Sequence, residues 1–429
     1  MKSVADKAKG KSRPLPTCKR NDGFGAVAVG AAACGRSGDR FPACIDGSNM
    51  RLTVCTCLAL LCASSLPEAQ RIRYGPGVCG PLDPTYVKVA TGTGGQPYPV
   101  SPEEIGKSPG PMNASFFEQL ILWASGDRDY SYVVPVDSTV TRMMLSGTFD
   151  GTGGAVTVTA PDRSLVQQGV AGVEDNLLNC GRIMVVDTPA AGNWQIRIAP
   201  TGRFWLRVQA KSDLSLGAEF VEPDAGLEPG RFVRIQGEPI AGRSATLRVS
   251  VTSEIKTPTF HLVSVDAQPI RAVDLHSTDS GEFIGVIEPP REAFRVMAIG
   301  RDESGLTVQR MKAGLFHSEP IEIVPPEGRT VTAGATVPVT FTIRNHGLAV
   351  HLRLIAADGS GTVLAVDPPT LDLAAGAEGA ATVRLRVPAD AAPSGEASIR
   401  LTATSDENAA VGGFNSAQKA YRIVSAPPY

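Results

Sequence analysis

The sequence predicts an all-β protein, built from three consecutive β-sandwiches behind a loop-rich N-terminal segment. Three observations lead to this prediction. Hydrophobic residues make up 42% of the 429 residues and charged residues 20%, which is the composition of a chain that forms a core. The 45 Gly and 33 Pro supply turns for many short strands. From residue 116 onward, short runs of alternating apolar and polar residues are separated by turn clusters.

The first 69 residues differ from the rest in charge and texture. Residues 1–49 hold nine Lys/Arg and four Asp, a net charge of +5. After Met50, the apolar run Leu52–Ala63 ends at small residues, which is the pattern of a secretory signal peptide. We therefore predict a signal peptide over residues 50–69 and interpret residues 1–49 as an extension upstream of the true start.

Two cleavage sites fit this signal peptide, one after Ser65 and one after Ala69. A second interpretation takes Lys2–Arg20 as the basic region and Gly23–Ala33 as the apolar region, although this run is less apolar than the one after Met50. Both interpretations predict an exported protein, found in the periplasm or outside the cell.

Cysteine usage agrees with export. Six of the eight cysteines precede residue 70, which leaves Cys79 and Cys180 in the mature chain. Two cysteines in an exported domain form a disulfide more often than they remain free thiols. Both lie beside glycines that relax the local backbone, so we predict a Cys79–Cys180 disulfide. The alternative is a pair of buried thiols; the spacing gives little support to a metal site.

Residues 70–115 form the loop-rich segment. Within it we predict a strand over Tyr86–Ala90 and a helix that begins at Ser101, with Pro102 at its first position and acidic residues in its first turn. We expect this segment to pack on the first sandwich, with Tyr86–Ala90 added to a sheet as an edge strand.

Three blocks of predicted strands follow, each about the size of a sandwich domain. The first sandwich covers residues 116–219, the second 220–320 and the third 321–429. The strands expected in the first are 120–124, 130–136, 140–149, 155–159, 182–186, 193–198 and 203–210. Those expected in the second are 232–235, 245–251, 259–265, 270–275, 282–287 and 294–300, and those in the third are 337–344, 350–356, 381–387 and 397–404.

One motif resembles a site for a divalent cation. Asp137, Ser138, Thr139 and Thr141 fit the Asp-x-Ser/Thr-x-Ser/Thr pattern that holds such an ion in type A domains, since hard cations take carboxylate and hydroxyl oxygens. That site needs an alternating β/α sheet, whereas only strands are predicted around these residues. We therefore favour a structural role, with threonines on one face of a strand.

Other polar and aromatic residues have simpler structural interpretations. Gly92–Gly95 lacks the spacing of a phosphate-binding loop and is predicted to be a turn. The tryptophans fit either a sandwich core or a platform for sugar rings, and the histidines are scattered among predicted strands. These residues are Trp123, Trp194 and Trp205, and His261, His276, His317, His346 and His351.

Several segments resemble hemicentin-like extracellular proteins, in the region that follows their von Willebrand type A domain. They are Tyr132–Asp137, Val140–Gly147, Asp187–Ile198 and Gly202–Phe204, while Lys88–Glu104 resembles the end of the type A domain itself. The first sandwich also resembles galactose-binding-like and pre-peptidase C-terminal sandwiches, and the second is expected to be immunoglobulin-like. Residues 321–425 resemble a bacterial immunoglobulin-type domain. The resemblance implies an extracellular array of sandwiches with an adhesion role. Because the body of the type A domain is missing, its metal site is not carried over to any residue here.

Charge and hydropathy exclude two broad classes of protein. With 41 basic and 43 acidic residues, the net charge of −2 provides no basic surface for nucleic acid. No apolar run reaches the ~18–20 residues that a membrane-spanning helix needs. The sequence thus predicts neither a nucleic-acid-binding protein nor one with a membrane-spanning segment.

We predict a secreted structural or adhesion protein that presents sandwich surfaces to a protein or glycan of the cell surface or matrix. It is predicted to be no enzyme, with no catalytic residue, cofactor or metal, because the spacing of a nucleophile and its base, of paired carboxylates or of zinc ligands is missing. The alternative is a secreted hydrolase, or an accessory binding module of one, whose catalytic groups converge from distant loops.

Overall fold

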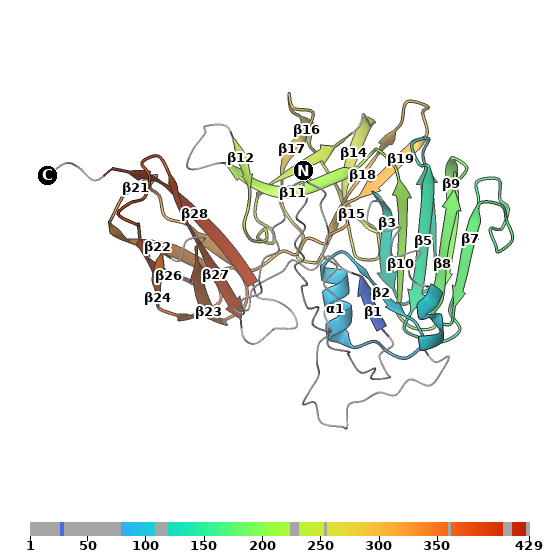
Figure 1. Ribbon diagram of the computed structural model, residues 1–429, viewed down its shortest axis with the longest axis horizontal. Coiled ribbons are helices and arrows are strands. Elements are labelled where there is room, and N and C mark those ends of the chain that lie inside the picture. The colour runs from blue at the N-terminus through green and yellow to red at the C-terminus, as the bar shows by residue number, and fades with distance from the viewer. Residues whose placement is uncertain are drawn as a thin grey trace, which may run out of the picture.

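The structure is a computed structural model that describes residues 26–29, 79–107, 119–223, 231–252, 255–358, 362–405 and 414–425. Within these ranges the protein is a row of three β-sandwiches, as the sequence predicts (Figure 1). The first sandwich and the N-terminal segment lie at one end of the row, and the third sandwich lies at the other. The predicted signal peptide and most of the predicted extension fall outside the described residues.

The first sandwich packs a five-stranded sheet against a three-stranded one. The larger sheet has the order β3 (Gln119–Gly126), β10 (Phe204–Lys211), β5 (Arg142–Phe149), β8 (Gly181–Asp187), β7 (Val173–Leu178), and the smaller has the order β4 (Tyr130–Val136), β9 (Gly192–Ala199), β6 (Ala155–Thr159). Along β9 the side chains of Trp194, Ile196 and Ile198 are buried and the residues between them are exposed. This period of two places one face of the strand in the core.

The second sandwich joins a five-stranded and a four-stranded sheet. Their orders are β12 (Phe232–Arg234), β11 (Leu216–Pro223), β13 (Ala245–Val251), β17 (Phe283–Ile287), β16 (His276–Ser277), and β15 (Pro269–Val273), β14 (Lys256–Val263), β18 (Arg295–Arg301), β19 (Thr307–Met311). Phe220, Phe294 and Phe316 fill its core, with ring centroids 4.9–6.3 Å apart. Because β11 begins at Leu216, this strand spans the boundary that the sequence placed between residues 219 and 220.

The third sandwich pairs a four-stranded with a five-stranded sheet. Their orders are β20 (Ile321–Val324), β22 (Thr336–Asn345), β26 (Glu378–Arg386), β24 (Val363–Asp367), and β21 (Thr330–Thr332), β28 (Phe414–Val424), β27 (Glu396–Ser405), β23 (Val350–Ala357), β25 (Thr370–Leu373). Its own cluster of buried apolar residues, centred on Phe341, Leu352 and Leu401, is separate from the other cores. β21 pairs in parallel with β28, whereas the other strand pairs of this sandwich are antiparallel.

The first two sandwiches share part of their cores, although the second also has a buried cluster of its own. Val263, Met297 and Met311 belong to the second sandwich but pack in the buried cluster of the first. The side chain of Gln309 on β19 also donates a hydrogen bond of 3.0 Å to the Ile121 carbonyl oxygen on β3. Apolar burial across a junction makes relative motion costly, so these two sandwiches form one body.

The strand predicted over Tyr86–Ala90 is wrong, because the structure places these residues in the helix α1 (Pro84–Gly92). Asp83 caps this helix, its carboxylate accepting hydrogen bonds from the N–H groups of Thr85 at 2.7 Å and Tyr86 at 3.4 Å. Pro84 at the first helical position has the φ that a helix needs. The alternating valines of this stretch are typical of a strand, but the N-cap at Asp83 and the proline after it favour a helix.

Two further elements complete the N-terminal segment. Pro102–Lys107 forms a 3₁₀ helix at the place where the sequence predicts a helix start. β2 (Gln96–Pro99) pairs antiparallel with β1 (Ala26–Val29). The four residues of β1 lie within residues 1–49, which a start at Met50 would leave out.

The N-terminal segment packs on the first sandwich, as expected, but through β2 and not through an added edge strand. The buried Gln96 amide donates hydrogen bonds to the Ser146 and Trp205 carbonyl oxygens, at 3.2 and 3.0 Å, and to the Thr148 hydroxyl at 3.0 Å. These partners lie on the neighbouring strands β5 and β10. The segment therefore covers the outer face of the five-stranded sheet, which explains why β5 is buried along nearly its whole length.

Candidate functional sites: polar junctions and an open groove

The motif that resembles a cation site is occupied by an arginine. Asp137, just after β4, forms an ion pair with Arg310 of β19, with 2.7 Å between Oδ2 and Nη1 and both side chains fully buried. The other carboxylate oxygen accepts a hydrogen bond of 3.1 Å from the Thr139 N–H group and one from its hydroxyl. The motif thus has a structural role at the junction of the first two sandwiches, but Thr139 and Thr141 lie in a turn and a bend before β5 and not, as the sequence predicted, on one face of a strand.

The remaining donors of Arg310 also have acceptors. Its Nε donates to the Leu214 carbonyl oxygen at 2.9 Å, and its Nη2 donates to the Ser212 hydroxyl at 2.8 Å. Leu214 and Ser212 lie in the link between β10 and β11. A buried ion pair offsets its desolvation only when its other donors are satisfied too, and here they are. The arginine therefore holds three segments of chain together.

Ser138 forms a second polar contact across the same junction. Its N–H and hydroxyl groups donate to one carboxylate oxygen of Asp302, at 2.9 and 2.7 Å. Burial alone would raise the pKa of Asp302, but these bonds, together with N–H groups of Ser304 and Leu306, outweigh burial and lower the pKa below its usual value. Asp302 is therefore held in its charged form.

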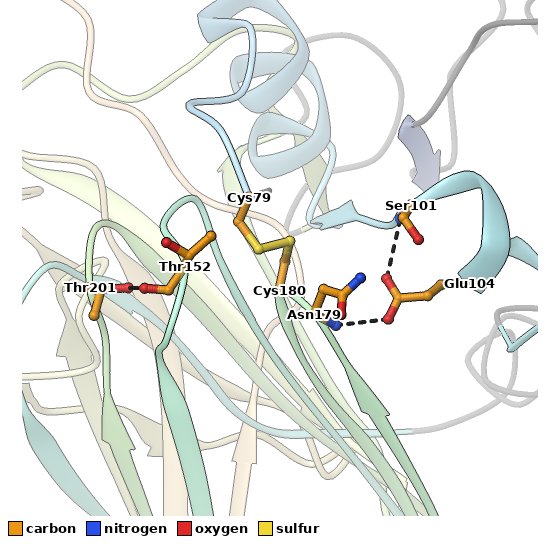
Figure 2. Close-up of a disulfide and its surroundings, with 7 residues drawn as sticks. All are labelled: Cys79, Ser101, Glu104, Thr152, Asn179, Cys180 and Thr201. Atoms are coloured by element: carbon orange, nitrogen blue, oxygen red, sulfur yellow. Dashed lines mark hydrogen bonds between the residues drawn. A yellow bond between two sulfur atoms is a disulfide. The ribbon is translucent and has the colours of Figure 1, made fainter. Parts of the chain in front are cut away.

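The structure joins Cys79 and Cys180 by a disulfide, with 5.5 Å between their Cα atoms, and this is the pairing that the sequence predicts (Figure 2). Cys180 lies in the turn between β7 and β8. Glu104 reaches the same turn, where its carboxylate accepts hydrogen bonds from the N–H groups of Asn179 at 2.8 Å and Ser101 at 3.2 Å. The N-terminal segment is thus fastened twice at one hairpin turn.

A third junction joins the second and third sandwiches through polar groups. Asn415 of β28 accepts from the Glu238 N–H group at 3.0 Å and donates to the Glu238 carbonyl oxygen at 3.2 Å. The same amide donates to the Ile321 carbonyl oxygen at 2.6 Å. The buried Asn415 therefore satisfies backbone groups on both sides of the link that enters β20.

A shallow groove of about 450 Å³ opens on the third sandwich, between β23 and β24. Ile355 and Leu364 line it, and their side chains are exposed by 48% and 55%. Among the described strands, β24 is at the edge of its sheet and pairs with β26 alone. Arg353, which carries a positive charge, also lines the groove. Here apolar side chains, a sheet edge and a charge occur together.

The structure places the tryptophans in the core and not on a surface for sugar rings. Trp123, Trp194 and Trp205 are exposed by 1–3% only. Two of the histidines are paired with carboxylates, His346 with Glu322 at 2.8 Å and His351 with Asp372 at 2.6 Å. Gly92 is the last residue of α1, and the predicted turn covers Thr93 and Gly94, with Gly94 at a φ of +78°.

Sequence reasoning did not identify Arg310 or Glu104. Arg310 contacts Asp137 across 173 residues, and Glu104 contacts Asn179 across 75. A buried arginine within an apolar strand pattern is the signal that points to Arg310, since such a charge needs a partner. For Glu104 the signal is its position three residues after Ser101, the spacing of a capping box.

No family model matches the chain. Two curated proteins are similar to it over less than half of its length. Hemicentin-1 of Mus musculus is 23% identical over 196 residues, which are 44% of this chain and 3% of that protein. Hemicentin-1 of Homo sapiens is 23% identical over 216 residues, which are 48% of this chain and 4% of that protein.

Three solved structures illustrate the structural likeness. Salmonella alpha-2-macroglobulin (mutant Y1175G) has a TM-score of 0.26 at 14% identity, over 70% of this chain and 23% of that one. The mouse nectin-like molecule 4 ectodomain, Ig1–Ig3, has a TM-score of 0.17 at 9% identity, over 71% and 96%. Titin domains I67–I69 have a TM-score of 0.16 at 12% identity, over 70% and 94%. Scores this low carry no argument, so the sandwich fold rests on the sheets described above.

The chain spans only a few per cent of the length of its curated relatives. This partial similarity does not assign the chain to the hemicentins.

Proposed function

We propose that this chain is an exported, non-catalytic interaction protein whose third sandwich binds a protein partner outside the cell. The observation that carries the proposal is the groove between β23 and β24. It combines the exposed side chains of Ile355 and Leu364 with the open edge of β24. An edge strand offers backbone donors and acceptors to an incoming strand, and apolar pockets beside it select the side chains.

The rest of the molecule suits a rigid support for this surface. The first two sandwiches share part of their cores and a buried ion pair. Asn415 fastens the third sandwich to the second. Arg353 in the groove favours a partner segment that alternates apolar with acidic residues.

Export is supported by the signal-peptide pattern after Met50 and by the Cys79–Cys180 disulfide. N-terminal sequencing of the protein recovered from outside the cytoplasm tests it. We expect a first residue of Leu66 or Gln70. A mature chain that retains residues 3–49 would contradict a start at Met50.

Binding is tested with the full chain and a double variant, Ile355→Asp with Leu364→Asp. We expect the wild type to bind intact producer cells through a protease-sensitive component, and the double variant to lose at least tenfold in affinity. Leu348→Asp is the matched control, because Leu348 is 86% exposed on the same sandwich but does not line the groove. Equal binding by all three chains would contradict the proposal.

Two parallel assays test the other functions. If the chain binds to a glycan array and the groove substitutions leave that binding unchanged, the partner is a glycan and not a protein. Turnover in a panel of peptidase, esterase and glycosidase substrates, abolished by one point substitution, would establish the hydrolase instead.

A further inference from the structure

Three arginines are fully or almost fully buried among the described residues, and two of them have a carboxylate partner. Arg310 pairs with Asp137. Arg182 pairs with Asp175 at 2.8 Å, and its other donors bind the Val156 and Val166 carbonyl oxygens at 2.9 Å. In both cases each nitrogen of the buried guanidinium group has at least one acceptor, as a buried charge requires.

Arg295 is buried in the same way, but its guanidinium group lacks such a set of hydrogen-bond acceptors. Its exposed fraction is 0%, and its only hydrogen bond within the described residues runs from Nε to the Ala313 carbonyl oxygen, at 3.2 Å. Both terminal nitrogens, Nη1 and Nη2, are buried and have no acceptor in the described part of the chain. The group instead stacks on Trp123, with 3.8 Å between Cζ and the ring centroid. The indole Nε1 of Trp123 is also buried without an acceptor.

The groups around this stack add positive charge. Arg207 sits beside Trp123 across the β3–β10 pair, and its charge adds to burial in lowering the pKa of Arg295 to about 9. Burial also lowers the pKa of His317, as do the charges of Arg295 and Lys88. The nearby acid Glu238 faces Lys312 and Arg234, and burial raises its pKa. The charges that act on Arg295 and His317 are thus all positive.

The N-terminal segment lies over this place. A Cβ atom on Gly94, in the turn after α1, would be 2.9 Å from the carbonyl oxygen of Ala313, the same oxygen that accepts from Arg295. The stack therefore lies where the N-terminal segment meets the first two sandwiches.

We propose that the Arg295–Trp123 stack is a binding site for a small oxyanion, such as a carboxylate, phosphate or sulfate. Such a ligand presents adjacent oxygens to the guanidinium fork and carries the negative charge that this cluster lacks. Its oxygens accept from the terminal nitrogens of Arg295 and from the indole N–H group of Trp123. This site is separate from the groove of the third sandwich and does not depend on its function.

The test measures the urea unfolding midpoint of the full chain in acetate, phosphate or sulfate, against chloride at equal ionic strength. Unfolding and refolding let the enclosed site equilibrate with each anion. We expect the midpoint to rise steadily with the logarithm of the concentration of at least one oxyanion, because a ligand of the folded state stabilises that state. The anion that acts at the lowest concentration identifies the class.

Three variants make the result specific. Arg295→Met should abolish the oxyanion effect, and Trp123→Phe should weaken it at least threefold in apparent affinity. Trp194→Phe is the matched control, because this tryptophan is equally buried but its indole N–H group already donates to the Ala190 carbonyl oxygen at 2.9 Å. If Arg295→Met does not fold, the comparison of Trp123→Phe with Trp194→Phe decides the question.

Equal responses of the wild type, Trp123→Phe and Trp194→Phe would show a general salt effect and would overturn the proposal. A crystal of the wild type that has been refolded and crystallised in selenate gives an independent result. An anomalous peak beside the guanidinium group of Arg295 would support the site, and two ordered waters at its terminal nitrogens would overturn it.

Discussion

At the scale of single residues, the junction of the first two sandwiches depends on charges that are buried and paired. Asp137 and Arg310 have no contact with solvent. In contrast, the Arg197–Asp129 pair on the surface has side chains that are 65% and 59% exposed. Burial decides the energetic weight of such a pair, because removing one partner in the interior leaves an uncompensated charge.

We expect Asp137→Asn to lower the free energy of unfolding by about 3–5 kcal/mol, because it leaves the buried charge of Arg310 without a carboxylate partner. Asp129→Asn, the surface control, should change it by about 0–1 kcal/mol. The double variant Asp137→Asn with Arg310→Met should lose less than the single buried substitution. Urea denaturation measures all three, and similar losses for Asp137→Asn and Asp129→Asn would contradict the account.

Asp302 adds a dependence on pH. Its pKa is lower in the folded chain than the ordinary value of 3.8, so the unfolded chain takes up the proton first as the pH falls. The contribution of Asp302 is therefore fully present above the unfolded pKa and is lost as the pH falls through the lower, folded value. Asp302→Asn should flatten the decline of stability below about pH 4.8, one unit above the unfolded pKa.

Denaturation curves between pH 7 and pH 2 measure this slope. Ser138→Ala removes one of the hydrogen bonds that lower the pKa, so it should flatten the slope only in part. A slope that is identical in the wild type and in Asp302→Asn would show that other groups account for the acid sensitivity.

At the scale of elements, the N-terminal segment depends on two ties at the turn between β7 and β8. We expect the variant Cys79→Ser with Cys180→Ser to lose up to about 4–5 kcal/mol, the chain-entropy value for closing a loop of this length. Amide exchange should then rise in α1 and β2 but not in β9. Glu104→Gln, which keeps the disulfide, should cause a smaller rise in exchange. Unchanged exchange in α1 after loss of the disulfide would show that the disulfide does not hold the N-terminal segment in place.

Elements with a clear alternation were predictable, and those defined by distant contacts were not. β6 and β13 have the predicted bounds, because each alternates in its own sequence. β7, with the sequence VEDNLL, and β28, with FNSAQKAYRIV, were missed because polar or small residues interrupt their pattern. At the candidate sites, the disulfide followed from cysteine usage, whereas the partner of Asp137 lies 173 residues away.

At the scale of the whole molecule, three sandwiches should behave as two cooperative units. The first and second share part of their cores, although the second also has a cluster of its own, while the core of the third is separate from both. We expect calorimetry to resolve two transitions, with the first two sandwiches unfolding together. Met311→Ala, which leaves a cavity in the shared core, should lower the midpoint of the larger transition only.

A fragment supplies the control for this prediction. Residues 321–429 alone should unfold at nearly the temperature of the smaller transition. Three separate transitions in the full chain, or stable folding of residues 116–215 on their own, would contradict the shared core.

The parallel pairing of β21 with β28 has a mechanical consequence. The Arg422 N–H group donates to the Arg329 carbonyl oxygen at 2.8 Å, and the Ala333 N–H group donates to the Val424 carbonyl oxygen at 3.0 Å, so this pairing extends past both ends of β21. A pull on the two ends of the third sandwich draws these strands in opposite directions along their length. All the hydrogen bonds between the two strands then bear the force at the same time and cannot break one after another. The sandwich therefore resists a force that pulls its two ends apart.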